Sequence, residues 1–123
     1  MPRQYINVPD IPKPLAHYTP AARAAHLVFA AGQIASDYKT GVHGEARVDP
    51  AFPYYGSEIK AAGTSLDNVV KAQVFMVNLD DFNGLDEVWR EFFPTPPPRT
   101  TVGTTGLLVR DALVEIDLIA TMP

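Results

Sequence analysis

Residues 69–104, VVKAQVFMVNLDDFNGLDEVWREFFPTPPPRTTVGT, contain the pattern that decides the fold. Val69–Val77 is rich in β-branched and aromatic residues and alternates in part, which predicts a strand. Asp80 and Asp81 then give an N-cap signal for a helix that runs to about Phe93. The apolar residues of this helix recur at steps of three and four and predict one buried stripe: Phe82, Leu85, Trp89, Phe92 and Phe93.

Two further strands follow this helix. Pro94–Pro98 ends the helix and stiffens the chain after it, and Arg99–Thr104 predicts the next strand. Leu113–Ala120 predicts the last strand, because its residues alternate between apolar and acidic. Its apolar side carries Val114, Ile116 and Leu118, and its acidic side carries Glu115 and Asp117.

Nearer the N-terminus, the apolar run His26–Ile34 predicts one more strand, and the polar residues after it predict a turn near Lys39–Gly41. These elements predict an α+β fold whose sheet is covered by helices on one face. Ser57–Ala62 does not fit this scheme, because it provides under two helical turns where a covering helix needs about a dozen residues. Either the sheet is half-covered here, or residues are missing from this part of the chain.

Composition limits the class of protein. The chain has 123 residues, 46% hydrophobic and 20% charged, so we expect one globular domain over residues 1–123. It has no cysteine, which excludes disulfides, thiolate nucleophiles and cysteine-ligated metals. A net charge of −4 without a basic stripe argues against nucleic acid as a partner. The N-terminal segment lacks the apolar run of a signal peptide, and no apolar stretch is long enough to span a bilayer, so we expect a cytoplasmic protein with no membrane partner.

Arg99 and Glu115 are the main candidates for chemistry. Arg99 follows three prolines, so its guanidinium extends from a stiff segment and could bind a carboxylate through two parallel hydrogen bonds. A salt bridge to one of the chain's acids is the equally weighted alternative. Glu115 lies either on a solvated face, which the pattern favours, or in a pocket where desolvation raises its pKa.

Other polar residues give weaker signals. Asp86 is four residues before Arg90, which predicts a helix-surface ion pair. Tyr18 could place a hydroxyl over a site or simply pack. The three histidines, His17, His26 and His43, lack metal-ligand spacing, so we expect no metal site. The chain has no glycine-rich nucleotide motif and no GxSxG, so dinucleotide and NTP chemistry have no support.

Four segments together resemble the Rid (YjgF) family of enamine and imine deaminases. HLVFAAGQIASDYKTG, AAGTSLDNVVKAQVFMVNLDDF, PPPRTTV and LVEIDLIA occur in the family's order and approximate spacing, from Tyr18 to Ala120. The resemblance implies a chorismate-mutase-like α+β fold of the bacillary type. It also implies a homotrimer with a central barrel and sites between subunits. In this family the first helix has roughly fifteen more residues, about 22 Å, between the positions of Lys60 and Ala61.

The resemblance also implies an activity and a set of site residues. Family members hydrolyse 2-imino or 2-enamino acids to 2-oxo acids and ammonia without metal or cofactor. Arg99 matches the carboxylate-binding arginine, and Glu115 matches the glutamate that activates water. Tyr18 and Gly32 match residues that line the pocket or contact substrate, and Thr101 replaces a cysteine found in many members.

Departures from the family pattern leave the substrate open. Asp86 replaces an asparagine and Ala31 replaces a serine, so pocket polarity differs from that of the best-known branch. A related branch deaminates 2-aminomuconate, which is one alternative substrate. A non-catalytic module that binds a carboxylate ligand is another alternative, and RNA cleavage is disfavoured by the acidic charge.

Overall fold

The protein is described here by a computed structural model, in which residues 2–9, 16–34, 36–37, 42–43, 53–110 and 112–123 are placed well enough to describe. The strands are β1 (Gln4–Ile6), β2 (Ala21–Ala24), β3 (Leu27–Ala30), β4 (Gln33–Ile34), β5 (Ser36–Asp37), β6 (Val42–His43), β7 (Val69–Met76), β8 (Arg99–Gly103) and β9 (Val114–Thr121). The helices are α1 (Pro53–Ala61) and α2 (Phe82–Phe92), with short 3-10 turns at Leu66–Asn68 and Leu79–Asp81.

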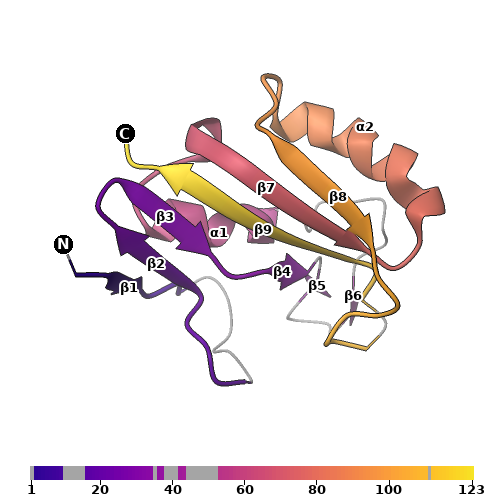
Figure 1. Ribbon diagram of the computed structural model, residues 1–123, viewed down its shortest axis with the longest axis horizontal. Coiled ribbons are helices and arrows are strands. Elements are labelled where there is room, and N and C mark those ends of the chain that lie inside the picture. Colours follow the sequence, from indigo (N-terminus) through magenta and orange to yellow (C-terminus); the bar gives the residue numbers. More distant parts are fainter. Residues whose placement is uncertain (1, 10–15, 35, 38–41, 44–52, 111) are drawn as a thin grey trace.

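One twisted sheet forms the framework of the fold (Figure 1). Its strands run in the order β1-β2-β3-β9-β7-β8, and β4 pairs with β9 beyond the end of β3. β8 is parallel to β7, as expected for two strands joined through a helix, whereas the other pairs in this sheet are antiparallel. β5 and β6 form a separate two-stranded ribbon.

Both helices cover the same face of the sheet. Ile59 from α1 and Leu85 and Trp89 from α2 belong to a single buried core. The sheet contributes alternate residues to that core: Ala72, Val74 and Met76 from β7, and Val114, Ile116, Leu118 and Ala120 from β9. We call this side the helix face and the opposite side the open face. The α+β class and the one-sided cover are therefore confirmed.

The open face carries a mixture of apolar and polar side chains. Phe29 and Val102 are 44% and 41% exposed, and no described helix covers them. Glu115 and Asp117 of β9 alternate with buried residues and so project from this face. None of the described helices is both long and apolar enough to cross a bilayer.

The predicted strands at 69–77, 99–104 and 113–120 are confirmed by β7, β8 and β9 to within one residue at each end. The predicted strand His26–Ile34 is wrong as one piece, because Ala31 and Gly32 separate β3 from β4. Between the register pairs Phe29–Ile119 and Gln33–Ile116, the β3–β4 side holds one residue more than β9. This extra residue is a bulge, which bends the chain over β9.

The two helices differ in detail from the prediction. α2 starts at Phe82 as expected and Asp81 occupies its N-cap position, but the Asp81 side chain makes no capping hydrogen bond. Instead, the Asn78 side chain accepts a 3.0 Å hydrogen bond from the Asp80 backbone N–H, at the start of the preceding 3-10 turn.

α1 begins at Pro53, earlier than the expected Ser57, and runs without interruption through Lys60 and Ala61 over nine residues. That this helix is shorter than those of relatives stays a prediction. The predicted turn at Lys39–Gly41 lies outside the described residues.

Candidate functional site

Arg99 is the first residue of β8 and points to the helix face. The Pro98 carbonyl accepts a 2.9 Å hydrogen bond from the Ala72 N–H, which fixes the start of the strand against β7. Arg99 is in register with Ala72, a core residue, so its side chain extends toward α2. The side chain is only 17% exposed. Arg99 is therefore a partly buried cation at a fixed position between the sheet and α2.

Two aromatic rings of α2 hold the guanidinium of Arg99. Its Cζ lies 5.0 Å from the centre of the Trp89 ring and 5.2 Å from the centre of the Phe82 ring. At these distances the electron-rich ring faces attract a cation. Trp89 in turn packs on Phe93, with ring centroids 4.7 Å apart. This stacking leaves the N–H groups at the guanidinium edge as the groups that bind anions.

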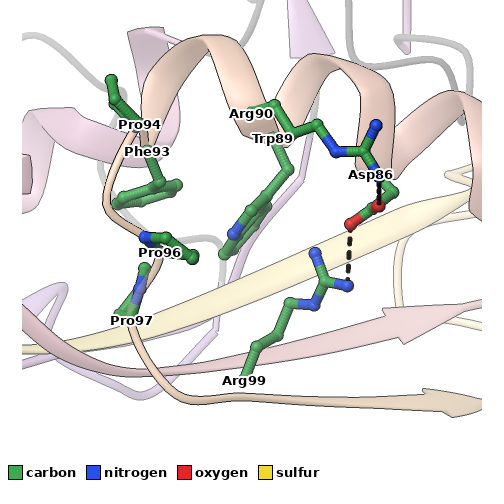
Figure 2. Close-up of a pocket in the computed structure, with 8 residues that line it drawn as sticks. All are labelled: Asp86, Trp89, Arg90, Phe93, Pro94, Pro96, Pro97 and Arg99. Carbon is green, nitrogen blue, oxygen red and sulfur yellow. Dashed lines mark hydrogen bonds and ion pairs between the residues drawn. The ribbon is translucent and has the colours of Figure 1, made fainter.

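A pocket opens beside this arginine (Figure 2). It has a volume of about 570 Å³. Arg99 enters from β8, while Asp86 and Arg90 approach from α2. The lining residues are Asp86, Trp89, Arg90, Phe93, Pro94, Pro96, Pro97 and Arg99. The pocket thus combines apolar walls with two guanidinium groups and one carboxylate, which suits a small ligand that carries a carboxylate.

Asp86 links the two arginines of the pocket. Its Oδ1 lies 2.9 Å from Arg99 Nη2, and its Oδ2 lies 3.1 Å from Arg90 Nη2. The predicted Asp86–Arg90 pair is confirmed. The Asp86–Arg99 pair also bears out the alternative reading of Arg99 as a salt-bridge residue, so in the unliganded chain this arginine holds an internal carboxylate.

Glu115 lies on the open face, against Gly32. A Cβ atom built on Gly32 would be 2.9 Å from Glu115 Cδ and 3.0 Å from Glu115 Oε2. The Glu115 side chain therefore lies over the bulge between β3 and β4, in space that only glycine leaves free. Burial raises the pKa of Glu115, and the negative charge of Asp117 raises it further.

Asp117 is the neighbour of Glu115 on this face, two residues along β9. Burial raises the pKa of Asp117 as well. With its amide oriented to donate, Gln73 of β7 places its side-chain nitrogen 3.2 Å from both Asp117 carboxylate oxygens. Glu115 and Asp117 thus form an acidic pair, in which Asp117 accepts hydrogen bonds from Gln73. Burial and, after it, the charge of Asp117 both favour the protonated form of Glu115 and so raise its pKa.

The structure divides the predicted site residues into groups. Thr101 is in register with Val74 on the helix face, on the same side as Arg99 and Asp86. Glu115 is in register with Phe75 on the open face, together with Gly32. Tyr18 lies in the segment before β2 with half of its side chain exposed. In a single chain, the pocket that Arg99 lines does not include Glu115, Gly32, Thr101 or Tyr18.

Several residues of the site are not singled out by the sequence. Its pattern assigns Phe82 and Trp89 to the core, and Trp89 is indeed buried, but both also stack on Arg99. The pattern assigns Asp117 to the acidic side of its strand without a role. The signal that could have found the aromatic pair is its position on the helix: Phe82 and Trp89 flank Asp86 at four and three residues, so one helix face carries both rings and the carboxylate.

Within the ranges that the structure describes, no group of three histidine, aspartate or glutamate side chains is arranged to hold a metal ion. Of the three histidines, His17 and His26 are exposed at the surface. The side chain of His43 is outside the described set.

The chain matches the family model described as Endoribonuclease L-PSP over residues 9–122. It is 34% identical over 123 residues to a protein from Dermatophagoides farinae named 2-iminobutanoate/2-iminopropanoate deaminase, covering 96% of this chain and 95% of the relative. Among solved structures, TdcF from E. coli with bound serine superposes with a TM-score of 0.86 at 28% identity, covering 98% of this chain and 99% of that one. RidA from the Antarctic bacterium Psychrobacter superposes with a TM-score of 0.85 at 30% identity, and the match covers 97% of this chain and 99% of that one.

The fold and the two groups of site residues define a small α+β protein with a pocket lined by two arginines and one aspartate. The comparisons make the class specific: the chain belongs to the L-PSP family, also called the Rid family. The resemblance of the four sequence segments to this family is thereby confirmed. At the level of the family, imine deamination is the activity that the relatives' names support.

Proposed function

We propose that this protein is a hydrolytic deaminase that converts a 2-imino or 2-enamino acid into a 2-oxo acid and ammonia. The observation that carries the proposal is Arg99, a partly buried guanidinium that lines a pocket of about 570 Å³. Arginine binds a carboxylate in a fixed, planar geometry. A substrate held in this way places the carbon next to its carboxylate at a defined distance from the pocket wall.

The reaction needs one water and one group that moves protons. Water adds to the imine carbon, its proton passes to the base, and the imine nitrogen takes up a proton to give a carbinolamine. The C–N bond then breaks as ammonia leaves, and the hydroxyl loses its proton to form the 2-oxo acid. Glu115 would accept the water proton and return it to nitrogen, and its raised pKa suits both steps. No metal and no organic cofactor is needed in this scheme.

A second copy of the chain would complete the site. Arg99 and Glu115 lie on opposite faces of one sheet, so one chain does not place both groups over one small substrate. Packing between copies through the open face would also cover Phe29 and Val102. A homotrimer with a central barrel meets both requirements, with Arg99, Asp86 and Thr101 from one copy facing Glu115, Gly32 and Tyr18 of another.

Ammonia release from a panel of 2-imino acids tests the function. The imines are produced in place by an amino-acid oxidase, and the panel runs from 2-iminopropanoate to larger members and 2-aminomuconate. Wild-type protein should speed ammonia release, and Arg99→Ala should lower the rate at least about 100-fold while the melting temperature changes little. Retained activity in Arg99→Ala would refute the mechanism.

The same panel separates the alternatives. Preference for 2-aminomuconate would identify the protein as a 2-aminomuconate deaminase. Binding of 2-oxobutanoate without ammonia release from any substrate would identify a non-catalytic module that binds carboxylates.

A further inference from the structure

Asp86 occupies the position at which a ligand carboxylate would meet Arg99. Its Oδ1 forms an ion pair with Arg99 Nη2 at 2.9 Å within the pocket (Figure 2). A carboxylate is the anion that a guanidinium binds with the best geometry. Arg99 is therefore already paired with a carboxylate of its own chain.

The surroundings of Asp86 offer it a second partner. Arg90 is one helical turn further along α2 and already lies 3.1 Å from Asp86 Oδ2. The Arg90 side chain is 79% exposed, so it has room to change its rotamer, whereas Arg99 is 17% exposed and stacked on Phe82 and Trp89. A small rotation of the Asp86 side chain, without movement of the helix, would transfer its ion pairing from Arg99 to Arg90.

The charges favour an exchange over simultaneous binding. The lining of the pocket carries two positive charges and one negative charge. A ligand carboxylate on Arg99 would lie next to the Asp86 carboxylate, and two like charges at such short range repel each other. Asp86 must then either move toward Arg90 or weaken the binding of the ligand.

We propose that Asp86 is an internal competitor for Arg99 that sets how tightly the pocket binds carboxylates, and that Arg90 receives Asp86 when a ligand arrives. This inference rests on the proposed role of Arg99 as the carboxylate-binding residue. It makes Asp86 a specificity-determining residue: weakly held carboxylates fail to displace it, and only ligands with additional contacts to the apolar walls do so. The opposing possibility is that Asp86 positions Arg99 for the ligand, and this possibility predicts changes of the opposite sign.

Titration calorimetry with 2-oxobutanoate as the probe tests the proposal. Asp86→Asn keeps the size of the side chain and removes its charge, so the dissociation constant should fall about three- to tenfold. Glu87→Gln is the matched control, because it removes the same charge from the next residue of α2, which is exposed and outside the pocket lining. That variant should bind as wild type does.

A second variant tests the role of Arg90. Arg90→Gln should weaken binding of 2-oxobutanoate in the wild-type background, because Asp86 then has Arg99 as its remaining partner in the pocket. In the Asp86→Asn background the same change should have little effect, so the two substitutions are coupled. Weaker binding in Asp86→Asn, or unchanged binding, would overturn the proposal.

The calorimetry on Asp86→Asn and the ammonia-release assay can succeed or fail independently of each other. If wild-type protein releases no ammonia but Asp86→Asn still binds 2-oxobutanoate more tightly, the deaminase proposal fails and the competitor stands. If ammonia release depends on Arg99 but Asp86→Asn binds more weakly, the deaminase stands and the competitor fails.

Discussion

Arg99 and Glu115 project from opposite faces of one sheet, although a single strand, β7, separates the strands that carry them. Arg99 is in register with Ala72 of β7, whose side chain is in the core. Glu115 is in register with Phe75 of β7, whose side chain points to the open face. The two groups that the proposed reaction needs are thus presented in opposite directions. In the proposed function each chain would therefore contribute two half-sites, which can be altered separately.

Gly32→Ala should displace the Glu115 carboxylate. The new Cβ would lie 2.9 Å from Glu115 Cδ, which is too close, and the flexible end of the Glu115 side chain can move away at small cost. We expect ammonia release to fall about ten- to 100-fold, with little change in melting temperature. Gly106→Ala is the control, because nothing lies within 4 Å of the position that its new Cβ would take. Full activity in Gly32→Ala would show that the position of Glu115 does not matter.

Asp117→Asn should move the pH dependence of the reaction. The pKa of Glu115 is raised first by burial and then by the charge of Asp117, so removing that charge lowers this pKa. Because the base must be ionised to accept a proton from water, the acidic limb of the kcat/KM profile should shift to lower pH. Lys71 of β7 also faces this side, hydrogen-bonded to Thr100 at 2.8 Å, and is unchanged in the variant.

The control for that shift is Asp67→Asn, which removes one negative charge from an exposed 3-10 turn. It should leave the profile where it is. If the acidic limb of the kcat/KM profile does not shift in Asp117→Asn, that limb reflects the ionisation of a group other than Glu115.

Glu58 should make the stability of the protein depend on pH. Its side chain is completely buried in α1. Burial raises the pKa of Glu58 from 4.5 to about 8, although the nearby Gln33 side chain and Ala31 backbone offset part of this rise.

The folded state therefore binds more protons than the unfolded state between these two pKa values, and the free energy of unfolding should fall as the pH rises from 4.5 to about 8. The full loss is on the order of 5 kcal/mol. Urea unfolding at pH 5 and pH 8 measures most of this loss. Glu58→Gln, which has no ionisable group at this position, should remove most of the pH dependence. An equal loss of stability in both proteins would assign the dependence to other groups.

The sequence predicts those parts of the fold that depend on local pattern. The alternation in β9 and the apolar stripe of α2 both follow from neighbouring residues, and both are confirmed. The Asp86–Arg90 pair is also local, because four residues make one helical turn. The helix α1 begins at Pro53, four residues before the predicted segment Ser57–Ala62, because the pattern that indicates a helix covers only that segment.

The site depends on contacts that no local pattern contains. The Asp86–Arg99 pair requires α2 to lie over the start of β8, and the Gly32–Glu115 contact requires the bulge between β3 and β4 to fall opposite β9. That Arg99 and Glu115 face in opposite directions follows from the register of β8 and β9 on the shared strand β7. Pairing partners and register are tertiary properties, so the sequence identifies the residues but not their grouping.

Complementation between two inactive variants tests the central claim that a site needs Arg99 of one chain and Glu115 of another. Arg99→Ala and Glu115→Gln are each expected to be inactive alone. They are then mixed in equal amounts, unfolded and refolded together, and native mass spectrometry confirms mixed oligomers.

If each site takes Arg99 and Glu115 from two chains, about one site in four receives both intact residues, and about a quarter of the wild-type ammonia release should return. Mixed oligomers that remain as inactive as the separate variants would contradict the account.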